Sequence, residues 1–146
     1  MRVVTQDRRE EAQSVQSAAT AWAASRSDVV GLALVGSWAR DQADMASDVD
    51  LVVLTTDPAP YVETDDWWSF LGEATLVHTK RWGPVTERRM RLTSGLEVEF
   101  GLADPEWSET DPVDAGTLSV VRDGMRILYD PHGQLGALAA ACSIAE

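Results

Sequence analysis

The chain has 146 residues, a hydrophobic fraction of 45%, a charged fraction of 25% and a formal net charge of −12. This composition indicates one soluble globular domain spanning residues 1–146. General nucleic-acid binding and docking on an anionic membrane both require a basic surface, so a chain whose only lysine is Lys80 is expected to do neither. Cys142 is the only cysteine, which excludes an internal disulfide and a cysteine-based zinc site. Because the charged N-terminus does not resemble a signal peptide and no apolar run has transmembrane length, a cytoplasmic location is expected.

In the first third of the chain, apolar residues recur at helical spacing from about Gln6 to Ser25, which predicts a helix. The nearly continuous apolar run Val29–Val35 then predicts a strand that is buried on both faces. Ser37–Arg40 is expected to begin a short helix, and Asp41–Ser47 is expected to be a polar loop. A second core strand is predicted over Asp48–Leu54.

Prolines mark the stretch 55–60 as a loop. A short helix is expected over Asp65–Leu71, and it carries Trp67 and Trp68. Two adjacent residues cannot both face inward on one helix, so one of these tryptophans is expected to be partly exposed and to mark a partner or dimer surface. The alternation in Ala74–Trp82 predicts a third strand.

The next two segments, Val85–Leu92 and Leu96–Leu102, predict a hairpin around Thr93-Ser94-Gly95. A three-residue hairpin loop that ends in glycine is a recognised type, because glycine readily adopts a left-handed conformation. This register sorts most apolar side chains to one face and charged side chains to the other. The pairs expected on the two faces are Leu92–Leu96, Met90–Val98 and Arg88–Phe100, and Arg91–Glu97 and Arg89–Glu99.

Towards the C-terminus, the acidic stretch 104–114 is expected to be a solvated loop. Pro112–Val121 is predicted to be helical, Met125–Tyr129 to be a short edge strand, and Pro131–Ala141 to be the terminal helix. Cys142 is expected to act as a small apolar residue there.

Two short motifs flank the polar loop, and together they suit phosphoryl chemistry. Gly36-Ser37 leaves the first core strand and offers backbone N–H groups and a hydroxyl to phosphate oxygens. Asp48-x-Asp50 lies at the start of the next strand, where alternation points both carboxylates to one face. Carboxylates combined with substrate phosphates are the ligands that Mg²⁺ prefers.

The order of these motifs resembles the DNA polymerase β-like nucleotidyltransferase superfamily, and most of all its small "minimal" members. Their signature is G-S-x-A-R-G, a short polar loop, and then S-D-x-D-L. This chain departs from the signature at Asp41, where glycine is usual, and thereby gains a negative charge near the expected phosphate site. The matching residues are Gly36, Ser37, Ala39, Arg40, Ser47, Asp48, Asp50 and Leu51.

The resemblance implies an α+β fold of polymerase β type, with a mixed central sheet of about five strands and helices packed mainly on one face. It also implies that Asp48 and Asp50 hold Mg²⁺, with two ions about 3.5–4 Å apart that bridge the phosphates of an NTP. Gly36 and Ser37 would hold the β- and γ-phosphates. Arg40 would either reach the triphosphate or pair with a nearby aspartate.

A third carboxylate on a later strand, flanked by apolar residues, completes the site in this superfamily. Glu97 and Glu99 both qualify, and both point to one face of their strand. Glu99 is favoured because it lies further from the hairpin turn and therefore deeper in the sheet. Its role would be to bind metal or to orient and deprotonate the acceptor hydroxyl. The alternative is that both glutamates merely pair with Arg89 and Arg91 across the hairpin.

Several other residues have a structural explanation that is preferred over a functional one. Trp38 could stack on a base, but packing in the core is the more common role of tryptophan. His78 and His132 are isolated, with no second histidine at ligand spacing, and are interpreted as structural.

The resemblance thus implies an Mg²⁺-dependent nucleotidyltransferase that moves an NMP from an NTP to a hydroxyl and releases pyrophosphate. The acceptor would be a small molecule or a partner protein. Since antibiotic-modifying relatives usually carry an added helical domain, for which this chain has no room, the acceptor site would come from a homodimer or another chain. The alternative is a catalytically degenerate, antitoxin-like module that binds a nucleotide or a partner.

Overall fold

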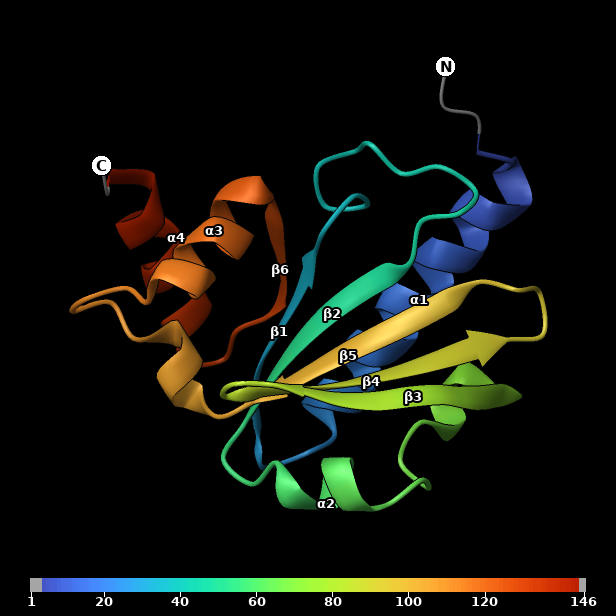
Figure 1. Cartoon of the computed structure of the whole chain (residues 1–146), viewed down its shortest axis with the longest axis horizontal. Coiled ribbons are helices and arrows are strands. Elements are labelled where there is room, and N and C mark those ends of the chain that lie inside the picture. The colour runs from blue at the N-terminus through green and yellow to red at the C-terminus, as the bar shows by residue number, and fades with distance from the viewer. Residues whose placement is uncertain (1–3, 145–146) are drawn as a thin grey trace.

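The computed structural model describes residues 4–144, which form one mixed six-stranded sheet with helices on both sides (Figure 1). The strand order is β3-β4-β5-β2-β1-β6. Only the central pair, β2 and β5, is parallel, and the other neighbours are antiparallel. This confirms the α+β fold and adds a sixth strand to the five or so that were expected. The strands are β1 (Val29–Val35), β2 (Val49–Thr55), β3 (Ala74–Trp82), β4 (Val85–Leu92), β5 (Glu97–Ala103) and β6 (Met125–Tyr129).

Both faces of β1 are covered by helices, which differs from the expectation that helices pack mainly on one face. The long helix α1 lies behind the sheet in Figure 1, whereas α3 and α4 lie on the other side beside β1 and β6. The reason is visible in β1, whose first six residues are all buried, so that each face needs its own cover. The helices are α1 (Gln6–Ala24), α2 (Ala59–Glu63), α3 (Ala115–Asp123) and α4 (Gln134–Ile144), with short 3₁₀ turns η1 (Ser69–Leu71) and η2 (Pro105–Ser108).

The β4–β5 hairpin has the register that the sequence predicts. Arg89 pairs with Glu99, Met90 with Val98, and Arg91 with Glu97. Gly95 has φ 93°, the left-handed conformation that the loop requires. The alternation therefore directs most charged residues of both strands to one face and the apolar residues to the core, where Arg88 is the one buried charge of the hairpin.

Two local predictions were wrong. The segment expected to begin a short helix is a hydrogen-bonded turn, in which the amides of Ala39 and Arg40 donate to the carbonyl of Gly36. A single turn has little intrinsic stability, and it ends at Asp41, whose φ is 57°. The helix expected over 65–71 is reduced to η1, and α2 forms earlier, where a loop was expected to end.

Trp67 and Trp68 are both buried, with 7% and 8% exposure, because they do not lie on a helix. Trp67 packs between Trp22 and the ring of Phe100, at centroid distances of 5.3 and 5.0 Å. The prediction of an exposed aromatic partner surface at this place was therefore wrong. These rings belong to the larger of the two core clusters, on the α1 face of the sheet.

In the C-terminal third the predicted elements are present, with shifted bounds for the helices predicted over 112–121 and 131–141, which are α3 and α4. The acidic segment is exposed, apart from the turn η2, and β6 is an edge strand that pairs with β1. Cys142 is 2% exposed and belongs to the second core cluster, with Leu135 and Leu138 of α4. Within residues 4–144, no helix combines the length and apolar character that crossing a membrane requires.

Candidate functional site

A row of polar side chains crosses four neighbouring strands on the sheet face opposite α1. Asp50 of β2 is in register with Glu99 of β5, Glu99 with Arg89 of β4, and Arg89 with His78 of β3. The strand alternation that directs Leu51 and Phe100 into the core turns their neighbours Asp50 and Glu99 to this other face.

Three of the predicted site residues come together at one end of this row. One carboxylate oxygen from each of Asp48, Asp50 and Glu99 lies within 4.8 Å of the others. Glu97 is directed elsewhere, and its two oxygens contact Arg91 at 2.7 Å and Arg89 at 3.1 Å. Of the two candidate third acids, it is thus Glu99 that the structure brings to the aspartates. The parallel pairing of β2 with β5 produces this arrangement.

Asp50 is partly buried, and its environment opposes the charged form. Burial, together with the nearby charges of Glu99 and Asp48, raises the pKa of Asp50 to about 7. Its Oδ1 is buried and has no hydrogen-bond partner among the described residues. Burial likewise raises the pKa of Asp48, although Arg89 opposes that shift. Such a group of carboxylates fits a divalent cation, which would offset both the desolvation and the mutual repulsion.

Gly36 packs directly against this acid group. Its φ is 77°, and a Cβ built there would lie 2.5 Å from Oδ2 of Asp50. Any side chain at this position would therefore collide with the carboxylate, a reason for glycine that the sequence motif does not reveal. The amides of Ser37 and Trp38, which follow, make no backbone hydrogen bond within the described part of the chain. These free amides suit an anion.

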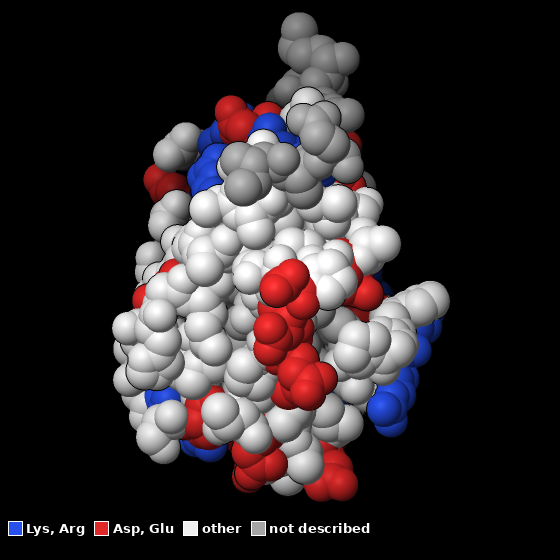
Figure 2. Space-filling model, turned by 90° about the vertical axis from the view of Figure 1, so that its left-hand side faces the viewer, with Lys and Arg blue, Asp and Glu red and all other residues white. Residues whose placement is uncertain are grey.

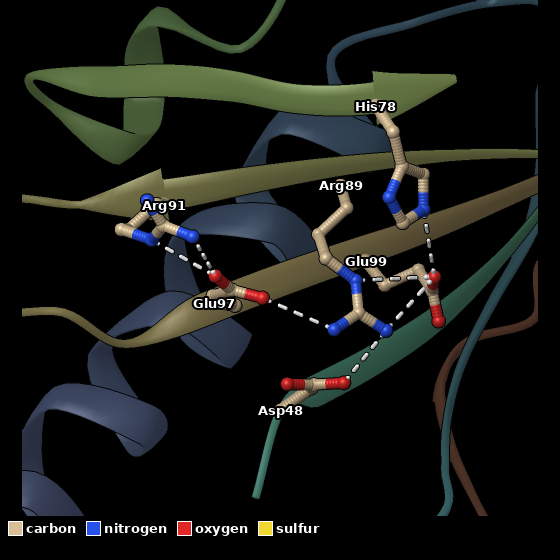
Figure 3. A network of polar contacts seen from close by, with 6 residues as sticks. All are labelled: Asp48, His78, Arg89, Arg91, Glu97 and Glu99. Atoms are coloured by element: carbon tan, nitrogen blue, oxygen red, sulfur yellow. Dashed lines mark hydrogen bonds and ion pairs between the residues drawn. The ribbon is translucent and has the colours of Figure 1, made fainter. Parts of the chain in front are cut away.

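Arg89 lies at the centre of the network in Figure 3. Its guanidinium contacts Asp48 at 2.8 Å, Glu97 at 3.1 Å and Glu99 at 3.2 Å. Burial alone would lower the pKa of Arg89, but these carboxylates raise it above its usual value. Arg89 is thus a fixed cation that bridges two of the three clustered acids. The sequence predicts its pairing with Glu99 but gives no sign of its contact with Asp48.

The remaining predicted residues lie around the turn. Arg40 is exposed, and its Nε donates to the side chain of Gln42 at 3.3 Å rather than reaching the acids. Within residues 4–144 it forms no ion pair with an aspartate. Trp38 is half-buried and packs against the α1-side core cluster, in line with the structural interpretation. Ser37 does not cap a helix, because no helix begins there.

A cleft of about 450 Å³ adjoins the acid group. Asp50, Glu87 and Glu99 are among its polar lining residues, and Trp82 and Trp107 are among its apolar ones. The side chain of Trp82 is 59% exposed. The volume lies in the range of small-molecule sites, about 300–1,000 Å³.

Figure 2 shows the side of the molecule on which α3 and α4 lie. Most of this face is uncharged, a band of acidic side chains crosses it, and basic side chains lie only near the edges of the view. This distribution offers no basic track for a nucleic-acid backbone on this face.

Residues 19–97 match the family model described as a nucleotidyltransferase domain. Since the match covers more than half of the 146 residues, the chain belongs to this nucleotidyltransferase domain family. The matched region contains Gly36, Asp48 and Asp50 and ends shortly before Glu99. A comparison with curated proteins gives no significant match.

The fold is also found in a solved structure. An aminoglycoside 6-adenyltransferase from Bacillus subtilis superposes with a TM-score of 0.51 at 14% identity, over 69% of this chain and 37% of that protein. A nucleotidyltransferase-like protein from Exiguobacterium sibiricum has a TM-score of 0.46 and 19% identity, over 90% of this chain and 38% of that protein. The chain thus spans little more than a third of the length of either protein.

Proposed function

We propose that the protein transfers an NMP from an NTP to an acceptor hydroxyl, with Mg²⁺ as cofactor and pyrophosphate as the second product. The observation that carries this proposal is the meeting of Asp48, Asp50 and Glu99 beside the Gly36 turn. Membership of the nucleotidyltransferase domain family supports the same reaction class.

In this reaction the acceptor oxygen forms a bond to the α-phosphorus, and the bond from that phosphorus to the oxygen bridging to the β-phosphate breaks. Asp48, Asp50 and Glu99 would hold Mg²⁺, which when bound would neutralise charge on the phosphates and on the attacking and leaving oxygens. Glu99 also adjoins the cleft and would orient the acceptor hydroxyl and accept its proton. Asp50 must be ionised for this work, and a bound cation favours the ionised form.

The turn after β1 would bind the β- and γ-phosphates. The free amides after Gly36 and the hydroxyl of Ser37 supply donors, and the absent Gly36 side chain permits a close approach. Arg40 lies exposed at the end of this turn, and releasing its contact with Gln42 would let it pair with a phosphate oxygen.

The acceptor would enter through the cleft that ends at Asp50 and Glu99. A small molecule with an apolar part suits the cleft's lining, and a hydroxyl-bearing side chain of a partner protein is the alternative acceptor. One structural neighbour is an aminoglycoside adenyltransferase, which supports a small acceptor. A homodimer or a partner chain would complete a larger acceptor site.

A second candidate function is a module that binds a nucleotide or a partner without catalysis, in the manner of an antitoxin. The ion pairs of Arg89 with Asp48 and Glu99 favour it, because a guanidinium already neutralises part of the acid group. Mg²⁺-dependent NTP binding without turnover would identify this module.

The proposed function is tested by thermal unfolding with ATP, GTP, CTP or UTP, with and without Mg²⁺. A ligand that binds only the native state stabilises it by RT ln(1 + [L]/Kd), so one nucleotide is expected to raise the unfolding temperature only when Mg²⁺ is present. Asp50→Asn should lose this shift. Asp57→Asn, at an exposed site beyond the other end of β2, is the matched control and should keep it. A shift of equal size in Asp50→Asn, or none with any nucleotide, contradicts the assigned site.

A further inference from the structure

His78 faces the acid group because β3 contains a bulge. Ala74 and Leu76 pair with Leu92 and Met90, on the core face. Regular alternation would place residue 78 on that same face. Instead the register shifts between Leu76 and His78, and His78 pairs with Arg89 on the opposite face. Bulges are common beside functional sites, where they redirect a side chain.

The redirected imidazole ends beside two carboxylates. Nε2 of His78 lies 3.7 Å from Oε1 of Glu99, as Figure 3 shows, and Glu87 of β4 approaches the same place. One ligand atom from each of His78, Glu87 and Glu99 lies within 4.8 Å of the other two. This Nε2 is buried and has no hydrogen-bond partner in the described part of the chain. An unsatisfied buried polar atom is costly unless a ligand completes it.

The negative charges of Glu87 and Glu99 are not fully offset by positive charge at this point. A carboxylate oxygen of Glu87 lies within 4.8 Å of one of Glu99, and like charges this close repel unless a cation lies between them. Arg89 forms an ion pair with Glu99, but its single positive charge is shared with Asp48 and Glu97. Glu87 and Glu99 line the cleft, which gives an ion a route from solvent.

We propose that His78, Glu87 and Glu99 form a second cation site, which binds a divalent transition-metal ion. An imidazole nitrogen with two carboxylates suits Mn²⁺, Co²⁺ or Zn²⁺, whereas Mg²⁺ prefers oxygen ligands alone. Metal–ligand distances of about 2.0–2.2 Å are compatible with ligand atoms spaced this closely. Glu99 would bridge this site to the group formed with Asp48 and Asp50. The inference goes beyond the proposed transfer reaction, because it requires neither an NTP nor an acceptor.

The test uses Co²⁺ as a spectroscopic probe on the full chain, in excess Mg²⁺ so that Mg²⁺ competes for the all-carboxylate group. Visible absorption reports the affinity, and NMR of the imidazole protons reports the ligand. The sequence contains only two histidines, and His132 is exposed, which makes it an internal control. Saturating Co²⁺ is expected to broaden the signals of His78 and to leave those of His132 sharp. Equal effects on both histidines, or no effect on His78, would overturn the proposal.

Variants then separate this site from the acid group. His78→Gln and Glu87→Gln should each weaken Co²⁺ binding by about 100-fold or more, since even changes around a ligand cost about 10–100-fold. His132→Gln should bind Co²⁺ as the wild type does, and Asp50→Asn should retain the absorption and the broadening of His78. Binding that survives His78→Gln but is lost in Asp50→Asn places the ion among the carboxylates alone and overturns the proposal. Loss of the nucleotide-dependent shift without loss of Co²⁺ binding contradicts only the proposed transfer function.

Discussion

The two faces of the sheet use the same strands for different purposes. On β5, Phe100 is fully buried against aromatic rings of the α1 face, while the adjacent Glu99 belongs to the acid group and lines the cleft. On β4, Arg88 is buried among satisfied partners, while Arg89 bridges carboxylates on the open face. One face is densely packed and mostly apolar, with the charge of Arg88 fully paired, and the other carries charges that burial and like-charge repulsion disfavour.

This contrast teaches that stability and function should be separable by substituting neighbouring residues. Strand alternation places consecutive side chains in environments that share a backbone but no contacts, so the effects of substitutions on the two faces should be nearly independent. The acid face retains its unfavourable charges because a ligand would compensate them, as is typical of functional sites.

Phe100→Ala should have the largest effect on stability. The ring is 0% exposed and packs on Trp67 and Phe70, so its removal is expected to cost about 3–5 kcal/mol. Urea unfolding measures this loss, and Glu99→Gln on the next residue is the comparison, with an expected loss below about 1 kcal/mol. The nucleotide-dependent shift in unfolding temperature should depend on the two residues in the opposite way. It should be reduced in Glu99→Gln and should survive in Phe100→Ala at temperatures where that variant is folded. A cost below about 1 kcal/mol for Phe100→Ala would contradict the division between the faces.

The pH dependence of stability should reveal the strain at Asp50. Its pKa is about 7 in the folded protein and near 3.8 when unfolded. Between these values the folded state retains a proton that the unfolded state has lost, so the free energy of unfolding falls as pH rises through this window. Above pH 7 the penalty is fully present. Asp50→Asn removes it and should be more stable than the wild type by about 2–4 kcal/mol at pH 8, with little difference at pH 3.5.

The measurement is the difference in unfolding free energy between wild type and Asp50→Asn across pH, because acids distant from Asp50 cancel in that difference. Mg²⁺ should reduce the difference at pH 8, since a cation bound at the ionised carboxylate offsets the same penalty. A difference that does not change with pH would show that Asp50 is not strained.

Arg88→Ala should lower the free energy of unfolding substantially, although Asp65, the ion-pair partner of Arg88, is exposed. The guanidinium donates to the carbonyls of Tyr61 and Thr64 at 3.1 and 2.6 Å and lies 5.0 Å above the ring of Trp68. Removing the guanidinium leaves the Thr64 carbonyl without this donor and the Tyr61 carbonyl with only the Trp67 indole N–H, which is expected to cost about 2–3 kcal/mol. Arg91→Ala is the matched control, because that exposed ion pair should contribute about 1 kcal/mol or less. Similar losses in both variants would show that burial does not distinguish these arginines.

Much of the fold follows from the sequence, because its strongest signals are local. The apolar run of β1, the alternation of β4 and β5, and a loop ending in Gly95 fix the hairpin and its register. The register in turn places Glu99 and Glu97 on one face. The motif residues Asp48 and Asp50 meet Glu99 because β2 and β5 pair in parallel, a contact that the family resemblance supplied rather than the local pattern.

Other features could not be predicted, because they depend on tertiary contacts. The register shift in β3 has no marker in the sequence, so the approach of His78 to Glu99 could not be predicted. Trp67 and Trp68 are both buried because the chain around them is irregular, and a helical interpretation forbids that arrangement. Arg89 was paired correctly with Glu99, but its contact with Asp48 requires the neighbouring strand β2.

Substitutions of Asp41 should have the smallest effect on stability. They test the turn after β1 rather than either face of the sheet. It adopts φ 57° with an exposed side chain, at the position where the family signature usually has glycine. Left-handed backbone costs most L-residues about 1–2 kcal/mol, and less for aspartate. Part of the gain from Asp41→Gly is lost to the greater freedom of glycine in the unfolded chain, about 0.5–1 kcal/mol.

The expected result for Asp41→Gly is therefore a stabilisation of about 0.5 kcal/mol, whereas Asp41→Ala should destabilise by about 0.5–1 kcal/mol. Urea midpoints at an unchanged m-value measure both changes. Because the side chain is exposed, the opposite signs of the two variants can arise only from the backbone. If both variants destabilise the protein, the carboxylate itself supports the turn, and the aspartate is then part of the phosphate-binding loop's architecture rather than a tolerated departure from glycine.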